Sequence, residues 1–341
     1  MSKPLGTLLS AENFRTLGPE LQSKRFRFLV TGGAGFIGSH IAETLIGLNQ
    51  EVVVLDSLVN GRRENLPNDV RFIEGDIRNV DAVDQAVKGA DFVLHQAALG
   101  SVPRSLTEPV LFHDVNVTGT LNVFEAARRH SVKRVVYASS SSVYGSTTQH
   151  PNTEGCEGEL LSPYALTKHA NEKYAQMQSK AFGFSTVGLR YFNVFGPRQN
   201  PNSQYAAVIP KFITSLLKNE APTIYGDGEA SRDFTFVQNV VYANLIACFA
   251  DLSSIQGDYR LSAMNVACGH TTSVNDLFSQ IARLLDSQIV TKHVSPRAGD
   301  IRYSYANIER ARRLLKFEPQ VEIADGLSVT VEWYKKFGGK S

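Results

Sequence analysis

Tyr164 and Lys168 carry side chains that together could remove a proton from a hydroxyl group. They stand four positions apart in a segment that opens with Ser162-Pro163, a good N-cap and first helical residue, and stops at Gly183. In a helix this spacing places both side chains on one face, where the ammonium favours the phenolate and tyrosine can act as a base. The same spacing also arises by chance, as a solvated lysine beside a half-buried ring. The interpretation therefore depends on the rest of the chain.

A glycine-rich turn, Thr31–Gly38, lies upstream between an apolar segment, Phe26–Val30, and a helical pattern from Ser39 to about Leu48. Strand, glycine turn and helix in this order are the context that a dinucleotide fingerprint requires. Glycines allow the tight turn and let the backbone approach a pyrophosphate at the N-terminus of the helix. We therefore expect a dinucleotide to contact Gly32, Gly35, Phe36, Ile37 and Gly38.

Asp56 follows the next predicted strand, Glu51–Leu55, about 20 residues beyond the glycines. A carboxylate at this place can accept both ribose hydroxyls and repel a 2′-phosphate, which favours NAD over NADP. Arg62 and Arg63 weaken that preference, and an aspartate in a simple turn at the strand end is the alternative.

Strands and helices continue to alternate along the first 200 residues, which predicts an α/β protein with a Rossmann-type, doubly wound parallel sheet. Ligands in such sheets lie beyond the carboxyl ends of the strands, where the glycine turn, Gln96 and the serine cluster Ser139–Ser142 fall. The further strands are expected at Val70–Ile73, Phe92–His95, Arg134–Ala138 and Thr186–Phe195, and the helices at Val80–Val87 and Pro109–Arg129.

The chain divides into an N-terminal extension at 1–25, a Rossmann domain at 26–196 and a smaller, interleaved C-terminal α/β domain. Segments at about 233–269 are expected to return to the main sheet, and the second domain takes residues 197–232 and 270–341. A short helix at Ala11–Gln22 is predicted in the extension. The later elements are a helix at Val208–Lys218, strands at Pro222–Tyr225, Met264–Ala267 and Ile289–Val294, and helices at Val240–Phe249, Ile308–Leu315 and Leu327–Phe337.

The composition excludes several classes of protein. A net charge of +2, from 35 basic and 33 acidic side chains, gives no footprint for nucleic acid or an acidic membrane. The three cysteines have neither disulfide nor metal spacing, which favours a reducing compartment. No apolar run approaches the roughly 20 residues of a membrane span, and the first 25 residues do not form a signal peptide. We expect a cytoplasmic protein without a metal.

With these motifs together, the chain resembles the extended short-chain dehydrogenase/reductases that act on nucleotide-sugars, over roughly residues 26–338. Within them it is most similar to the UDP-N-acetylglucosamine 4-epimerases of bacterial surface-polysaccharide pathways, through the stretches QAALGSVPRS at 96–105 and AAVIPK at 206–211. The motifs that carry the wider resemblance are Thr31–Gly38, Asp56, Val143-Tyr144-Gly145 after the serines, Ser162–Lys168, Arg190–Asn193, Ser231–Asp233 and Arg297–Asp300.

The resemblance implies a catalytic group at each matched position. In this family the catalytic serine or threonine stands four residues before the tyrosine of the Val-Tyr-Gly motif, here Tyr144, which selects Ser140 as the partner of Tyr164 and Lys168. The other three serines of Ser139–Ser142 stay open as substrate contacts or as packing at a strand end.

Arg232 and Arg297 are expected to clamp the diphosphate, because a guanidinium pairs with phosphate oxygens in a bidentate way. Surface salt bridges are the alternative. NAD is the implied cofactor, and its further contacts are Asn60, Asp76, Ile77, Gln96, Ala97, Ala98 and Tyr191. The further substrate contacts are Ser101, Ser141, Ser142, Asn193, Ala207, Val208, Tyr225, Asp300 and Ser304.

Ser141 and Ser142 also bear on the reaction that the resemblance implies. Relatives that dehydrate or decarboxylate the sugar carry acidic residues just after the catalytic hydroxyl, where this chain has the two serines. Without such an acid–base pair, oxidation and re-reduction at C4 are favoured over elimination. The resemblance therefore implies epimerisation through a 4-keto sugar, with a dehydratase, a decarboxylase or a non-catalytic dinucleotide sensor as weaker alternatives.

Ser304 guides the choice of sugar. In this family, relatives limited to glucose and galactose have a tyrosine four residues after the aspartate of the Arg-x-Gly-Asp segment. Relatives that accept N-acetyl sugars have a small side chain at that position. Counting from Asp300 gives Ser304, although its neighbour Tyr303 would reverse the inference. UDP-GlcNAc and UDP-GalNAc are the expected substrates; a uronic acid or UDP-Glc/UDP-Gal is the alternative. The family also implies a homodimer through a four-helix interface built from Pro109–Arg129 and the Tyr164 helix.

Overall fold

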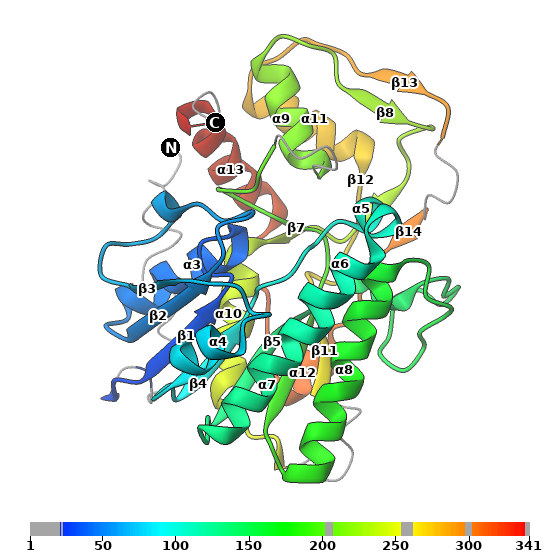
Figure 1. Cartoon of the computed structure of the whole chain (residues 1–341). Coiled ribbons are helices and arrows are strands. Elements are labelled where there is room, and N and C mark those ends of the chain that lie inside the picture. Colours follow the sequence, from blue (N-terminus) through cyan, green and yellow to red (C-terminus); the bar gives the residue numbers. More distant parts are fainter. Residues whose placement is uncertain (1–20, 22, 202–206, 254–261, 297–301, 338–341) are drawn as a thin grey trace.

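The computed structural model describes residues 21, 23–201, 207–253, 262–296 and 302–337 (Figure 1). The helix predicted at Ala11–Gln22 lies outside these residues except for Leu21, whose side chain is buried in the main core. Arg297 and Asp300 also lie outside them.

A seven-stranded parallel sheet forms the centre of the molecule, and this confirms the Rossmann-type prediction. The strand order is β11-β6-β5-β4-β1-β2-β3. Successive strands are added on one side of β1 up to β3 and on its other side from β4 onward, and sheets of this kind bind their ligands at that switch between β1 and β4. The returning strand near 264 joins the edge beside β6, as expected. The strands are β1 Arg27–Thr31, β2 Glu51–Asp56, β3 Arg71–Glu74, β4 Phe92–His95, β5 Arg134–Ser140, β6 Thr186–Tyr191 and β11 Ala263–Val266.

Helices cover both faces of this sheet, since its strands are apolar on both sides. One core joins the sheet to α3 (Phe36–Gly47), α10 (Val237–Phe249) and α12 (Glu309–Leu315). A second core, on the opposite face, joins it to α4 (Val80–Val87), α7 (Gly119–Arg129) and α8 (Pro163–Phe182). Figure 1 shows α7 and α8 running side by side in front of the sheet.

Two sequence predictions were wrong in detail, and two helices were not predicted. The single helix predicted at Pro109–Arg129 is α6 (Pro109–His113), a π-helical turn (Asp114–Thr118) and α7. The strand predicted to run to Phe195 breaks at Asn193, whose φ of +33° leaves the extended region, so β7 (Val194–Phe195) pairs instead with β10 (Thr235–Phe236). Two helices were missed, α5 (Val102–Thr107) and α11 (Val274–Leu284).

A third core lies beyond the carboxyl ends of the strands and joins α9 (Val208–Leu217), α11 and α13 (Ile323–Phe337). Short strands flank it: β8 (Thr223–Tyr225) pairs with β13 (Lys292–Val294), and β9 (Ser231–Arg232) lies between β12 (Thr272–Ser273) and β14 (Tyr303–Ser304). We propose that this core belongs to the smaller second domain, with the predicted division at residues 197–232 and 270–341.

The residues that the structure describes bear on two features, a membrane-spanning helix and a metal site. No helix there is long and apolar enough to cross a membrane. The same residues hold no group of three side chains suited to a metal ion, and the three cysteines are free thiols.

Candidate functional site

A cavity of about 1630 Å³ opens at the carboxyl ends of the strands, above β1, β2 and β4. Every residue expected from the sequence to contact the cofactor lines it. These are Gly32, Gly35, Phe36, Ile37, Gly38, Asp56, Asn60, Asp76, Ile77, Gln96, Ala97, Ala98, Tyr164, Lys168 and Tyr191.

The glycine turn has no room for side chains. Gly32 has a φ of +65°, and a Cβ there would lie 2.7 Å from the backbone of Ala97. A Cβ on Gly38 would lie 2.2 Å from the carbonyl oxygen of Gly32. α3 begins directly after Gly35, and no side chain caps its first turn, so its amides face the cavity uncapped. A turn built this way fits a pyrophosphate.

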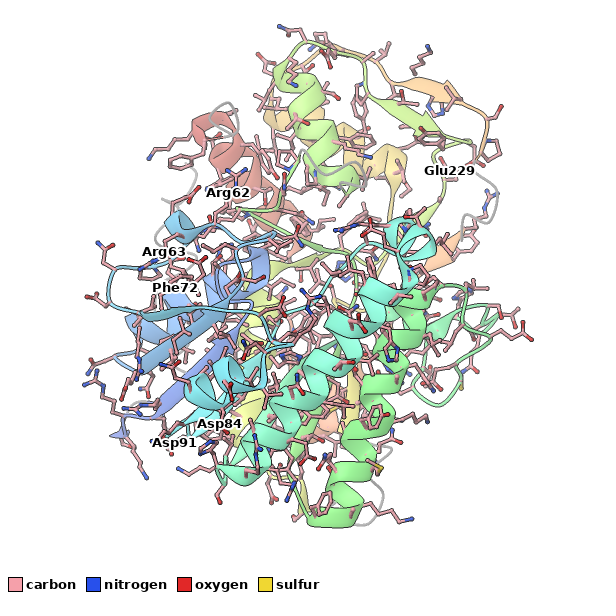
Figure 2. The ribbon with its side chains drawn as sticks, viewed as in Figure 1. Arg62, Arg63, Phe72, Asp84, Asp91 and Glu229 are labelled. Atoms are coloured by element: carbon pink, nitrogen blue, oxygen red, sulfur yellow. The ribbon has the colours of Figure 1, made fainter. Side chains whose placement is uncertain are left out.

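Asp56 ends β2 with its carboxylate held in place by backbone amides. Its Oδ2 accepts from the amide of Ala34 at 2.9 Å and its Oδ1 from that of Leu58 at 2.8 Å. Each oxygen keeps a free lone pair for a ribose hydroxyl. Arg62 lines the cavity, whereas Arg63 stacks over the ring of Phe72 at 5.0 Å (Figure 2). One of the two arginines that weakened the NAD prediction is therefore turned to another partner.

A hydrogen-bonded network of side chains borders the cavity at the carboxyl ends of β4 and β6. Gln96 donates to Asn244 at 2.9 Å, and the hydroxyl of Tyr191 donates to Gln96 at 3.0 Å. Asn244, on α10, was not expected from the sequence. It is buried, as are Gln238 and Asn239 on the same helix, and polar residues in a predominantly apolar helix were the available signal.

Tyr164 and Lys168 lie on the first turns of α8, as predicted. The side chain of Ser162 caps this helix by accepting from the amide of Ala165 at 3.1 Å, and Gly183 ends it with a φ of +65°. The Lys168 ammonium donates to the carbonyl of Ala138 at 2.9 Å and lies 6.0 Å from the centre of the Tyr164 ring.

Burial controls the ionisation of both groups. It raises the pKa of Tyr164 above its ordinary value, and a hydrogen bond with Ser140 only partly opposes the rise. Burial lowers the pKa of Lys168 to about 8. The sequence suggested that Lys168 would favour the phenolate, but in this structure burial raises the pKa of the phenol and so favours its neutral form. The phenol needs a further positive charge nearby before it ionises at neutral pH.

The serine cluster separates into distinct environments. The hydroxyl of Ser139 donates to Glu172 at 2.6 Å and is buried, while Ser140 meets Tyr164 and accepts from the amide of Ser142 at 3.1 Å. The hydroxyl of Ser142 is buried without a hydrogen-bond partner among the described residues. Of the four, Ser140 is therefore the hydroxyl that the fold sets against the phenol.

Asn116 connects this region to the cofactor side of the cavity. It lies in the π-helical turn, is fully buried and donates to the carbonyl of Leu99 at 3.0 Å and to the hydroxyl of Thr167 at 3.1 Å. Single π-helical turns inside α-helices are frequent at functional sites. A sequence pattern of period 3.6 cannot show such a turn.

The expected substrate contacts are more dispersed. Ser101 lines the cavity and caps α5, while the side-chain amide of Asn193 donates to the carbonyl of Asp233 at 3.1 Å. Arg232 and Ser304 are direct neighbours across β9 and β14. Among the described residues the cavity lining leaves out Ser140, Ser141, Ser142, Asn193, Ala207, Val208, Tyr225, Arg232 and Ser304.

Comparisons with known proteins agree with this geometry. A structure of UDP-N-acetylglucosamine 4-epimerase from Methanobrevibacter ruminantium, in complex with UDP-N-acetylmuramic acid, is 39% identical with a TM-score of 0.86, over 92% of this chain and 99% of that one. A UDP-glucose 4-epimerase of Thermus thermophilus, in complex with NAD, is 34% identical with a TM-score of 0.81, over 91% and 99% of the two chains. The UDP-glucose 4-epimerase of Mycolicibacterium smegmatis is 37% identical over 91% of this chain and 98% of its own length. The model of the NAD dependent epimerase/dehydratase family matches residues 28–261, and the chain belongs to that family, with NAD as its cofactor.

Proposed function

We propose that this protein is a 4-epimerase of UDP-sugars that interconverts UDP-GlcNAc and UDP-GalNAc. The observation that carries the reaction type is the meeting of Ser140, Tyr164 and Lys168 at the edge of a dinucleotide cavity. The similar proteins named as 4-epimerases of UDP-N-acetylglucosamine and UDP-glucose support the substrate class.

NAD, which the glycine turn and Asp56 would hold, would supply a hydride acceptor, and later the donor, for C4 of the sugar, and would bring a positive charge into the cavity. Tyr164 takes the proton of the 4-hydroxyl group, and Ser140 hydrogen-bonds the same oxygen. Lys168, fixed by its bond to Ala138, adds positive charge 6.0 Å from the centre of the Tyr164 ring. After oxidation to the 4-keto sugar, the ring turns about its link to the diphosphate and is reduced from its other face.

The register of β14 supports the choice of an N-acetyl sugar. Ser304 pairs with Arg232, and Tyr303 pairs with Ser231. Registered partners in a sheet share a face and successive residues alternate, so Ser304 lies on the face of the expected diphosphate clamp and Tyr303 on the other. Tyr303 instead meets the ring of His150 with centroids 6.5 Å apart. A small side chain on the Arg232 face leaves the volume that an acetamido group requires.

A panel of UDP-sugars tests the proposal. We expect the purified protein to convert UDP-GlcNAc to its C4 isomer faster than UDP-Glc or UDP-glucuronic acid, with NAD released only on denaturation. Ser304→Tyr should remove activity on the acetylated pair and spare the unacetylated pair. Wild-type turnover of UDP-GlcNAc by that variant would contradict the role of Ser304, and a dehydrated or shortened product would contradict epimerisation itself.

We also propose a homodimer through α6, α7 and α8. Val110 on α6 and Leu166 and Met177 on the adjacent α8 are 73%, 56% and 50% exposed, and such an interface would cover these large apolar side chains. Sedimentation should show a dimer for the wild type and a monomer for Leu166→Lys; a wild-type monomer would contradict this interface.

A further inference from the structure

Glu172 is a buried carboxylate on the catalytic helix. It follows Tyr164 and Lys168 at the same spacing of four residues, so the three side chains occupy three successive turns on one face of α8. Its side chain lies in the protein interior, with 1% of the residue exposed, and it does not line the cavity. A charge so deeply buried is costly unless its partners are well placed.

Two residues supply those partners from the central sheet. The hydroxyl of Ser139 donates to Oε1 of Glu172 at 2.6 Å, and Arg190 donates from Nε at 2.8 Å and from Nη2 at 2.7 Å. Ser139 on β5 and Arg190 on β6 are direct partners in the sheet register. Arg190 is held from its other side by Glu157 and by the ring of Tyr144, 5.0 Å away.

The carboxyl end of β5 therefore meets α8 at three consecutive residues. Ser140 meets Tyr164, the carbonyl of Ala138 accepts from Lys168, and Ser139 donates to Glu172. A shift of α8 by one residue moves every side chain by about 1.5 Å along the helix axis, which is enough to break all three contacts. Of the three helical side chains, Glu172 makes the greatest number of hydrogen bonds to the sheet, and it is the one that does not line the cavity.

We propose that Glu172 is a positioning residue that locks α8 in register with β5, so that Tyr164 and Ser140 reach the same hydroxyl group of the sugar. The inference rests on the role proposed above for Tyr164. A bidentate ion pair suits this task because it fixes direction and distance, whereas apolar packing allows sliding.

The test compares Glu172→Gln, Ser139→Ala and the double variant in the NAD-loaded enzyme. Each single variant should lower kcat roughly tenfold to 100-fold, the scale expected for a misplacement of about 1 Å, with KM within about threefold of the wild type. The double variant should be no slower than the slower single variant, because both changes break one unit. The isotope effect with substrate deuterated at C4 should rise in all three, as hydride transfer becomes rate-limiting.

Val87→Ala provides the matched control. Val87 is fully buried at the end of α4, at the amino-terminal edge of the sheet and away from the catalytic edge. Its substitution should lower the melting temperature while kcat and the isotope effect stay at wild-type values. If Glu172→Gln does not fold, Ser139→Ala decides alone, since it removes one contact and leaves the Arg190–Glu172 pair in place.

Three results would overturn the inference: wild-type kcat in the Glu172 and Ser139 variants, losses that multiply in the double variant, or an equal loss in Val87→Ala. Tyr164→Phe separates this inference from the proposed function. If Tyr164→Phe is inactive while Glu172→Gln is normal, only the positioning role fails. If Tyr164→Phe keeps its turnover, the proposed chemistry fails, and the positioning role fails with it.

Discussion

Replacing Arg190 by methionine should destabilise the fold strongly, because it leaves the Glu172 carboxylate buried with Ser139 as its remaining partner. The two residues of the pair are 4% and 1% exposed, so water cannot replace the guanidinium. Breaking one side of such a pair costs about 3–5 kcal/mol. Methionine fills much of the arginine volume with flexible apolar atoms, so most of this loss is the unpaired charge.

A second substitution, Glu172→Gln, in the same chain should recover much of that loss. With the charge gone, what remains is the absence of two or three hydrogen bonds of about 1 kcal/mol each. We therefore expect the double variant to be more stable than Arg190→Met by about 1–3 kcal/mol. Urea unfolding at one fixed NAD concentration measures these differences in the free energy of unfolding, provided that the free energy falls with urea concentration at the same slope in each variant. Destabilisations that simply add, with a coupling below about 0.5 kcal/mol, would refute the buried ion pair. Activity should stay low in the double variant, since stability returns but the register contact does not.

Other consequences follow from the same site. Tyr164→Phe should lower kcat by about 10² to 10⁴ without changing the melting temperature, because it removes the proton acceptor alone; near-normal turnover would contradict that role. Because burial lowers the pKa of Lys168 to about 8, protein refolded without NAD binds fewer protons than the unfolded chain between pH 8 and about 10.5. Its free energy of unfolding should therefore rise with pH in that window by up to about 3 kcal/mol relative to Lys168→Met, and a flat difference would contradict the buried ammonium. Gly38→Ala should lose bound NAD, measured in the supernatant after denaturation, because its Cβ meets the carbonyl oxygen of Gly32 at 2.2 Å. Gly47→Ala, where nothing lies within 4 Å, is the control and should keep its NAD.

The sequence was most informative where function depends on local order along the chain. The glycine turn, Asp56 at the end of β2 and the pair on α8 are each defined by neighbours within a few residues. Local rules of capping, turn formation and periodicity predict such features. All of the residues expected to contact the cofactor consequently line one cavity.

Features that depend on tertiary contacts could not be predicted in this way. Asn193 interrupts an apolar run that is typical of one long strand, and its side-chain amide donates to the carbonyl of Asp233, 40 positions away. Glu172 shows nothing in the sequence beyond a carboxylate on a helix, and its importance appears only when β5 and β6 bring Ser139 and Arg190 together. The sequence suggested a phenolate from the spacing of Tyr164 and Lys168, whereas the degree of burial, a property of the whole fold, decides the pKa.

The fate of the hydrogen at C4 tests the central claim most directly. UDP-GlcNAc carrying deuterium at C4 should be incubated with the purified enzyme, and the product analysed by NMR and mass spectrometry. We predict UDP-GalNAc with the deuterium still at C4 and the configuration there inverted, because the same hydride leaves and returns within one active site. Deuterium found at C6 of a dehydrated sugar, or lost to solvent, would contradict the account.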